Sequence, residues 1–341
     1  MKIEITKKNG IIAIIVFIAL AVLTYVVPDP DKEDDKDKKE QSDSLTFKHL
    51  KGDSDRSEGK GDDSDVIVND ALEGDPYKEL DELIGLQSVK EEVHTLANFV
   101  KVQKMRADKG LKNPKLSYHL VFTGSPGTGK TTVARIVARI YKDLGILKKG
   151  HLVETDRSGL IGQYVGQTAP RVNAVCDSAL NGVLFIDEAY AITQSESGND
   201  YGAEAIATLL KRMEDDRDKL VVIVAGYSKE MKKFIDSNPG LQSRFNRYIN
   251  FPDYSADELY QIFRMYMDKN EYTITQEAAS YLRQRLDYVV AHKDRNFGNA
   301  RYVRNVFEKI IQVQANRLST AGNVSARDLT EITLADVKQV L

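Results

Sequence analysis

The chain has 341 residues, of which 42% are hydrophobic and only one is cysteine. This length can hold two folded units with a substantial core, and a single cysteine excludes a disulfide framework. The net charge is −3 and there is no basic tail, which argues against a nucleic-acid partner.

A run without charged residues lies near the N-terminus, from Ile11 to Val27. As a helix it would be roughly 26 Å long, close to the hydrocarbon thickness of a bilayer. We therefore expect residues 1–28 to form a single-pass membrane anchor. The alternatives are a cleaved signal peptide, for which no small-x-small cleavage site precedes Pro28, and a buried core helix, for which nothing nearby looks foldable.

The segment after this run is acidic, with 14 acidic and 8 basic residues between Asp29 and Asp65. Such a composition cannot bury enough apolar surface to offset the entropy lost on ordering. We expect residues 29–76 to be an unstructured tether. Lysines flank both sides of the apolar run, so the positive-inside rule does not decide its topology.

Folded sequence is expected from Tyr77 onward, beginning with an amphipathic helix from about Ser88 to Lys109. The apolar run Tyr118–Thr123 is typical of a buried strand, and Thr132–Ile140 has its apolar residues at helical spacing. Between them lies the octapeptide Gly124-Ser125-Pro126-Gly127-Thr128-Gly129-Lys130-Thr131. A strand, this glycine-rich loop and a helix, in that order, are the setting of a phosphate-binding P-loop.

The chemistry of a P-loop explains these residue types. Glycines let the backbone turn its N–H groups toward phosphate oxygens, and the start of the helix adds positive charge. Lys130 would reach the β- and γ-phosphates, and the Thr131 hydroxyl would bind Mg²⁺. A glycine-rich turn without function is the alternative. We expect ATP and Mg²⁺ as cofactors, with phosphate contacts from Gly124, Ser125, Pro126, Gly127, Thr128, Gly129, Lys130, Thr131 and Thr132.

Later elements alternate between strands and helices. Strands are predicted at His151–Thr155, Gly182–Ile186 and Lys219–Ala225, and helices at Ala169–Leu180 and Ala203–Glu214. Apolar, β-branched runs between helices indicate an α/β fold with a parallel sheet covered on both faces. After Pro252 only helical patterns follow. We therefore expect an α/β domain over residues 77–252 and a helical lid over residues 253–341.

The strand at Gly182–Ile186 delivers Asp187 and Glu188 to its carboxyl end. There, the Asp187 carboxylate could hold Mg²⁺ and Glu188 could polarise an attacking water. An Asp-Glu pair at a helix N-terminus is the alternative interpretation. Because the pair occurs with a P-loop upstream, we predict a nucleotide-hydrolysing site. The need for cytosolic ATP places this part of the chain in the cytoplasm.

Together with the P-loop and Phe185-Ile186-Asp187-Glu188-Ala189-Tyr190, the segments Asn238–Phe245 and Gly298–Arg301 make residues 77–341 resemble an AAA+ ATPase. More narrowly, the chain is similar to the CbbX/CfxQ group, which includes the red-type rubisco activase and stage V sporulation protein K. The resemblance implies a ring-forming ATPase, expected to be a hexamer, that acts on a protein partner.

The resemblance also implies residue roles. Arg244 matches the arginine finger that acts on the neighbouring subunit's site, against the alternative of a surface arginine that caps a turn. Arg301 matches the sensor-2 arginine of the lid, with Arg304 as a competing candidate. Ile84 and Gly85 match the segment that lines the adenine pocket. Gly226-Tyr227 stands where many AAA+ proteins carry a polar sensor-1 residue, commonly Asn, which leaves that role unassigned.

Tyr164 and Val165 lie between glycines in the loop after the second strand, Leu160–Thr168. This loop resembles the first pore loop of hexameric remodelling ATPases, in which aromatic side chains grip an extended polypeptide. A tyrosine packed on its own domain is the alternative. We therefore expect a membrane-tethered motor that remodels or threads a protein client. A nucleic-acid loader, which would carry Lys or Arg in this loop, and a non-hydrolysing scaffold are the other candidate functions.

Overall fold

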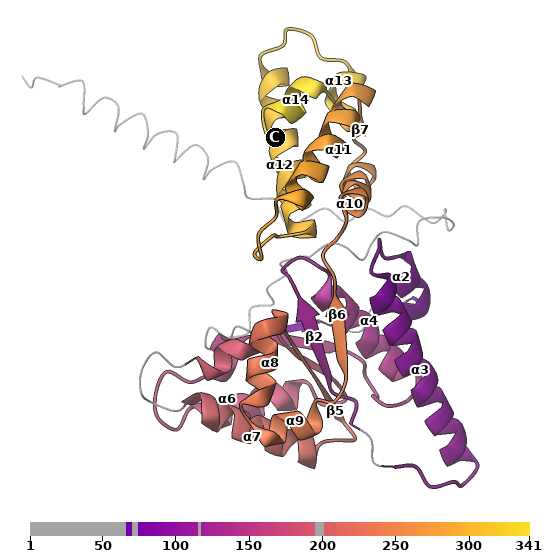
Figure 1. The fold of residues 1–341 in the computed structure, drawn as a ribbon, viewed down its shortest axis with the longest axis vertical. Helices are drawn as coiled ribbons and strands as arrows, with labels where there is room; N and C mark the ends of the chain where they lie inside the picture. Colours follow the sequence, from indigo (N-terminus) through magenta and orange to yellow (C-terminus); the bar gives the residue numbers. More distant parts are fainter. Residues whose placement is uncertain (1–65, 70–73, 115–116, 195–200) are drawn as a thin grey trace, which may run out of the picture. The chain divides into compact units, whose positions relative to one another are not determined.

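The computed structural model describes residues 66–69, 74–114, 117–194 and 201–341. Its larger sheet has six strands in the order β1-β3-β4-β5-β2-β6, and five of them are parallel (Figure 1). The strands are β1 (Ile67–Asn69), β2 (Leu120–Gly124), β3 (Leu152–Thr155), β4 (Gly182–Ile186), β5 (Leu220–Gly226) and β6 (Tyr248–Phe251). The α/β fold with a parallel sheet, predicted from the apolar runs, is confirmed.

Successive residues of the central strands enter two different cores. In β4, Val183 and Phe185 belong to one buried cluster and Leu184 and Ile186 to the other. This alternation is why the central strands read as continuous apolar runs instead of alternating with polar residues.

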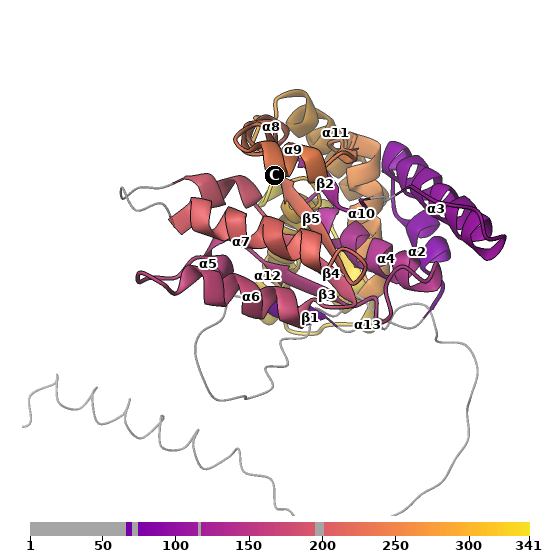
Figure 2. The same cartoon turned by 90° about the horizontal axis from the view of Figure 1, so that it is seen from below.

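Helices cover both faces of the sheet (Figures 1 and 2). The first core is closed by α2 (Pro76–Glu82), α3 (Gln87–Asp108) and α4 (Lys130–Asp143). The second is closed by α5 (Arg157–Leu160), α6 (Thr168–Ser178), α7 (Tyr201–Asp215), α8 (Ser228–Asp236) and α9 (Pro239–Arg244). Cys176 of α6 is fully buried in the second core, and burial raises the pKa of its thiol to about 12.

The predicted unstructured tether, residues 29–76, needs a correction at its C-terminal end. Strand β1 lies inside this range and pairs antiparallel with β3, so folded structure begins before Tyr77. Its pairing is reinforced by Asn69, whose Nδ2 donates to Glu154 Oε1 at 2.8 Å. Three residues are too few to show a strand period, and β1 is stabilised by a partner about 85 residues away in the sequence.

The predicted membrane anchor, residues 1–28, lies outside the described residues, as does most of the acidic segment. Among the helices that the structure does describe, none is both long and apolar enough to cross a bilayer.

The C-terminal lid is helical, as the sequence predicts. It comprises α10 (Ala256–Lys269), α11 (Gln276–Ala291), α12 (Ala300–Ser319), α13 (Ala326–Thr330) and α14 (Leu334–Lys338), with a small parallel pair of strands, β7 (Thr273–Ile274) and β8 (Glu331–Ile332). The linker from β6 ends at Ser255, whose side chain forms a capping box with Glu258 at the start of α10.

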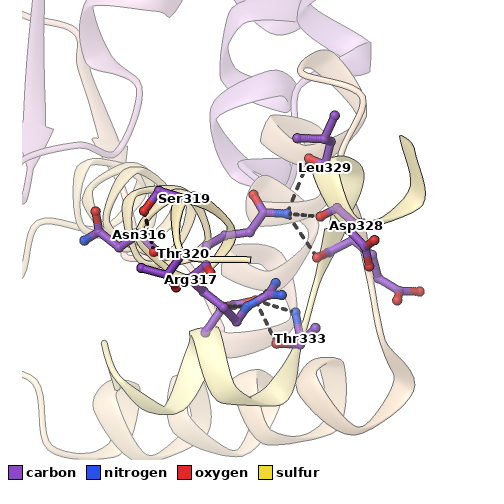
Figure 3. A network of polar contacts seen from close by, with 10 residues as sticks. Asn316, Arg317, Ser319, Thr320, Asp328, Leu329 and Thr333 are labelled. Carbon is purple, nitrogen blue, oxygen red and sulfur yellow. Dashed lines mark hydrogen bonds and ion pairs between the residues drawn. The ribbon is translucent and has the colours of Figure 1, made fainter. Parts of the chain in front are cut away.

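A polar network ties the end of the lid together (Figure 3). The buried Gln314 donates from Nε2 to the carbonyl oxygens of Asp328 and Glu331 at 3.1 and 3.0 Å. Arg317 makes two hydrogen bonds to the carboxylate of Asp336, at 2.8 and 2.9 Å. Asp336 is fully buried and also accepts from the backbone and hydroxyl of Thr333. The network joins α12 to α13, β8 and α14.

Replacing Asp336 by alanine is expected to lower the free energy of unfolding by about 2–3 kcal/mol, because the Thr333 N–H and the Arg317 guanidinium lose their acceptor. Burial alone would raise the pKa of Asp336, but the hydrogen bonds from Arg317 and Thr333 outweigh it and hold the pKa below its ordinary value of 3.8. The difference in unfolding free energy between wild type and variant should therefore be fully present above pH 3.8. It should shrink as the pH falls through the lower pKa of the folded state. Urea unfolding at several pH values measures it, with the exposed Asp287→Ala as control.

Candidate functional site

The glycine-rich loop lies between the carboxyl end of β2 and the start of α4. Gly127 and Gly129 have φ values of +69° and +91°, which favour glycine. Thr128 is buried, and its hydroxyl donates to the Ser125 carbonyl at 2.8 Å. Lys130 Nζ donates to the carbonyl oxygens of Gly124 and Ser125 at 3.0 and 2.8 Å. These bonds hold the lysine ammonium group against the inside of the loop.

Charged groups from three parts of the chain surround Lys130. Burial lowers the pKa of its ammonium group and so does Arg301, whereas Asp187, Glu188 and Asp253 act in the opposite direction; the net change is downward. Asp187 and Glu188 follow β4, Asp253 follows β6 and Arg301 lies in α12. The carboxyl ends of parallel strands meet at one edge of a sheet, and the lid contributes the arginine. The residues predicted from sequence for the phosphate site are therefore brought together.

Glu188 has an unusual backbone conformation. Its φ and ψ are +46° and +41°, a left-handed geometry that costs a non-glycine residue about 1–3 kcal/mol. Its N–H donates to Asp187 Oδ1 at 3.0 Å, and the short 3₁₀ helix η1 (Ala189–Thr193) starts directly after it. Strain of this kind persists where the surrounding structure fixes it, as at catalytic sites.

The residues around the loop fit a nucleotide with a divalent cation. The first N–H groups of α4 have no partner within the helix, and an N-terminus of this kind binds phosphate. Thr131, the second residue of α4, and Asp187 offer hard oxygen ligands of the kind that Mg²⁺ takes together with phosphates. Within the described part of the chain, no cluster of three His, Cys, Asp or Glu side chains forms a metal site from protein groups alone.

The segment Ile84-Gly85 lies where the α/β domain meets the lid. Gly85 has φ +60°, and a Cβ atom there would stand 2.2 Å from Glu258 Oε1 of α10. Ile84 packs against the core that the two parts share. This location between sheet and lid is the one that an adenine pocket requires, although the contact with adenine stays a prediction.

Sequence reasoning missed Asn299, which is completely buried. Its Nδ2 group donates to Asp253 Oδ1 at 2.9 Å and to the Phe297 and Pro126 carbonyls at 3.1 and 3.3 Å. Its Oδ1 accepts from the Tyr254 N–H at 3.0 Å. One amide thus joins the P-loop, the linker and the lid. The segment Gly298–Arg301 gave the only signal, and it pointed to the arginine.

The lid also contacts the P-loop through the main chain. The N–H of Ala300, the first residue of α12, donates to the Gly127 carbonyl at 3.1 Å. A Cβ atom on Gly127 would stand 2.1 Å from the Gly298 carbonyl oxygen. Of the two candidate sensor-2 residues, Arg301 lies near enough for its charge to lower the pKa of Lys130. Arg304 instead donates to Glu308 at 2.8 Å along the exposed side of α12. The structure therefore favours Arg301.

Arg244, the predicted arginine finger, ends α9. Its carbonyl accepts from Ser117 Oγ at 2.7 Å, just before β2 begins, while the P-loop follows the other end of β2. Seven residues of extended chain span roughly 23 Å, so Arg244 lies far from the phosphate site of its own subunit.

The guanidinium of Arg244 has weak partners. Nη2 lies 3.4 Å from Glu214 Oε2, Nη1 lies 3.4 Å from the Gly240 carbonyl oxygen, and Nε is buried without a partner among the described residues. The Gly240 contact is of the turn-capping kind that was the alternative interpretation. Neither contact is short, so a stronger hydrogen-bond acceptor could replace both of them.

Tyr164 and Val165 project from the surface, with 68% and 85% of their area exposed. They lie in a turn that is closed by a hydrogen bond from the Gln167 N–H to the Tyr164 carbonyl. In this single chain, Tyr164 is therefore not packed on its own domain. The same loop borders a pocket of about 370 Å³ lined by Arg157, Gly162, Gln163 and Glu188 among others. Arg157 donates to the carbonyls of Ala191 and Ile192 in η1, which connects the base of the loop to the segment after Glu188.

The structure explains why no polar side chain stands at Gly226. A Cβ atom there would lie 2.8 Å from ring carbons of Tyr190 and 3.0 Å from Met231 Sδ. Burial and, after it, the negative charge of Glu188 raise the pKa of Tyr190 to about 12, so this ring lies near Glu188.

Introducing a polar side chain at position 226 should therefore lower both activity and stability. We expect Gly226→Asn to lower the ATP turnover number by roughly tenfold or more, because overpacking here displaces Tyr190 beside Glu188. Steady-state hydrolysis and thermal unfolding measure the effect. Adding Tyr190→Ala to Gly226→Asn should recover part of the lost thermal stability; no recovery would mean that the collision with Tyr190 is not the cause.

Comparisons with known proteins agree with this geometry. Residues 120–253 match the ATPase family associated with various cellular activities (AAA), and residues 255–340 match the AAA lid domain. Stage V sporulation protein K of Bacillus subtilis is 42% identical over 264 residues, covering 76% of this chain and 81% of that protein. The chloroplastic ribulose bisphosphate carboxylase/oxygenase activase of Cyanidioschyzon merolae is 45% identical over 259 residues, covering 75% and 87%.

The crystal structure of the FIGL-1 AAA domain has the same fold, with a TM-score of 0.55 at 17% identity, covering 81% of this chain and 84% of that one. Proteins named CbbX and CfxQ match at similar identity to the activase. A P-loop after β2, an Asp-Glu pair at the end of β4 and a lid seated on the loop are thus combined with similarity to these proteins over about three quarters of the chain. The chain belongs to the AAA ATPase family, in the CbbX/CfxQ group, and is an ATPase.

Proposed function

We propose that this ATPase assembles into a ring, a hexamer, and uses ATP hydrolysis to pull on or remodel a polypeptide client. The position of Arg244 carries the proposal. It lies beside the amino end of β2, opposite the P-loop, and among the described residues its guanidinium makes only contacts of 3.4 to 3.5 Å. An arginine so placed can complete a neighbour's site but not its own, which a closed ring provides for every subunit.

Within each site we assign the following roles. The loop from Gly124 to Thr132 and the Lys130 ammonium bind the phosphates, and Ile84 and Gly85 line the base. Thr131 and Asp187 would hold Mg²⁺, which would neutralise charge on the phosphates. Glu188 orients the attacking water and takes its proton. Arg301 contacts the nucleotide from the lid, and Arg244 of the next subunit offsets charge on the γ-phosphate.

The client is proposed to be a polypeptide because the exposed loop tip is apolar. Tyr164 and Val165 offer an aromatic ring and an aliphatic chain, and no Lys or Arg lies between Leu160 and Thr168 for a phosphate backbone. The relative named ribulose bisphosphate carboxylase/oxygenase activase is named for its action on another enzyme. A ring of such loops would grip the main chain without reading its sequence.

We further propose that the ATPase is tethered to a membrane. Residues 1–28 would anchor the chain in a membrane through the run 11–27, the acidic segment up to Val66 would act as a spacer, and the α/β domain and lid would lie in the cytoplasm, where ATP is available. The absence of charge over 17 residues supports the anchor.

Mixing two inactive variants tests the shared site. Arg244→Ala lacks the finger but keeps Glu188, and Glu188→Gln keeps the finger but lacks the base. In a random mixture of equal parts, roughly a quarter of the interfaces pair an intact Glu188 with an intact Arg244. ATP hydrolysis by the full chain in mild detergent should therefore reappear on mixing. The control is Arg304→Ala, which removes an arginine paired along its own helix and should stay active alone.

Small amounts of Glu188→Gln should also poison wild-type activity more than dilution would. If the mixed variants stay inactive and poisoning merely follows dilution, the site is not shared, and a monomeric nucleotide switch would replace the ring.

A further inference from the structure

The C-terminal end of α3 is a structured element that the ATPase site does not use. Helix α3 has 22 residues, and its buried side chains run from Val89 to Val100. No residue from 101 to 108 is buried, and Figure 1 shows this end of the helix running on past the sheet. We name residues 101–114 the α3 tip. An unpartnered helix end of this length needs a reason, because its apolar residues stay in water.

The α3 tip is fixed in place by its own hydrogen bonds. Gly110, at φ +70°, donates to the Ala107 carbonyl at 2.8 Å, and Leu111 donates to the Arg106 carbonyl at 3.0 Å. These two bonds form a Schellman motif, which stops the helix and folds the chain back. Asn113 Nδ2 then donates to the Gln103 carbonyl at 2.6 Å. The exposure of the tip is therefore a property of a defined surface and not of a fraying end.

Apolar and basic side chains share this surface. Val102, Met105 and Leu111 are 52%, 52% and 51% exposed. The first two are one helical turn apart, and the Schellman turn brings Leu111 toward Met105. Five cations surround them and Asp108 is the only acid: Lys101, Lys104, Arg106, Lys109 and Lys112. Among the described residues, none of the five cations forms an ion pair.

We infer that the α3 tip docks on an anionic lipid surface. Exposed Val, Met and Leu within a ring of Lys and Arg is the composition of elements that lie in the membrane interface, where apolar groups enter the headgroup region and cations meet acidic lipids. The inference rests on the proposed anchor, because a patch of this size binds lipid weakly without one. The tether makes docking intramolecular and raises the effective lipid concentration.

Reach and charge agree with this occupant. As the unstructured tether that their composition predicts, the 38 residues from Pro28 to Asp65 would have an end-to-end distance of roughly 35 Å, about the length of α3. The tip can therefore reach the bilayer that holds residues 11–27. The acidic residues 29–65 are repelled by the same lipids, so the basic tip is the part that approaches them. The competing occupant is that acidic segment, which would neutralise the tip without lipid.

A fluorescent label on the tip distinguishes the two occupants. Cys176 is buried and its thiol pKa is about 12, so Ala107→Cys adds one reactive thiol on an exposed helical position. The labelled full chain is reconstituted in lipid nanodiscs of phosphatidylcholine alone, or with a third of the lipid replaced by phosphatidylserine. Both carry a headgroup-linked quencher. Retention in neutral discs reports on the anchor, and quenching of the label reports on the tip.

We expect quenching in the anionic discs and little in the neutral discs, with loss of quenching at high salt. Lys101→Gln with Lys109→Gln should lower the docked-to-undocked ratio roughly 30-fold, equivalent to about 1 kcal/mol for each lysine. The matched control, Lys229→Gln with Lys233→Gln on α8, should not change it. All of these chains should stay in the discs.

Two results would overturn the inference. One is a chain that stays in anionic discs while its label is not quenched. The other is a label shielded from an aqueous quencher equally in neutral discs and in detergent, which would assign the tip to the acidic segment or another protein surface. A chain that leaves the discs altogether refutes the proposed anchor instead. Anionic vesicles that carry the quencher would then be added to the released chain. Quenching of the label would still support lipid docking by the α3 tip, and absence of quenching would refute it.

Discussion

Gly127→Ala is expected to abolish ATP hydrolysis, with a turnover number at least roughly a hundredfold below wild type, and to loosen the lid. Two costs add at this position. A left-handed backbone at φ +69° costs alanine about 1 kcal/mol, and the new Cβ would stand 2.1 Å from the Gly298 carbonyl oxygen. Because that neighbour is main chain at the start of the lid, it cannot move aside without shifting α12 away from the loop.

Gly110→Ala is the matched control. Gly110 has φ +70°, almost the value at Gly127, but nothing lies within 4 Å of its Cβ position. It should lose about 1 kcal/mol of stability through backbone strain and keep its ATPase activity in detergent. Steady-state hydrolysis, nucleotide binding and thermal unfolding of both variants separate strain from collision. Equal loss of activity in the two variants would show that backbone strain, and not the contact with the lid, makes Gly127 necessary.

Asn299→Ala is expected to remove most of the activity and to lower the free energy of unfolding by about 3 kcal/mol. The change leaves the buried Tyr254 N–H without its acceptor and takes donors from the part-buried Asp253 and Pro126 carbonyl. Urea unfolding and steady-state hydrolysis measure the two effects. Asn296→Ala, an exposed residue of the same loop, is the control and should be close to wild type.

Asn299→Asp sharpens the test, because it keeps the acceptor for Tyr254 but sets a second carboxylate against Asp253. In wild type, burial would raise the pKa of Asp253, yet hydrogen bonds from Lys293, Asn299 and Ser125 outweigh it and lower that pKa. In the variant, a buried carboxylate at position 299 would face the half-buried Asp253, so one of the two should bind a proton more readily. The variant should be least stable at neutral pH and regain stability relative to Asn299→Ala as the pH falls. Parallel pH profiles of the two variants would refute this arrangement.

Much of this architecture could be predicted from local patterns. The P-loop, the strand before Asp187 and the apolar face of α3 each carry a signal within about twenty residues. Strand β1, strand β6 and helices α5, α8 and α9 do not, because they are short and depend on partners distant in the sequence. The roles assigned to Glu188, Arg244 and Tyr164 remain predictions; the structure places Glu188 in strained backbone, Arg244 beside the amino end of β2 and Tyr164 in solvent.

Asn299 could not have been predicted, for a different reason. A buried asparagine leaves no period and no spacing, and its importance comes from four partners in three separate segments. Gly226 is a related case. Its sequence context showed the absence of a polar side chain, and only the position of the Tyr190 ring showed that the backbone there has no room for one.

The hydrogen bond from the Ala300 N–H to the Gly127 carbonyl joins lid and loop through atoms that every amino acid possesses. This hydrogen bond therefore does not depend on which side chain residue 300 carries, but it does depend on the length of the chain before α12. One residue inserted between Phe297 and Ala300 would add up to about 3.5 Å of chain and move the Ala300 N–H away from the Gly127 carbonyl. Substitutions at Ala300 itself should thus be tolerated better than insertions or deletions between Phe297 and Ala300.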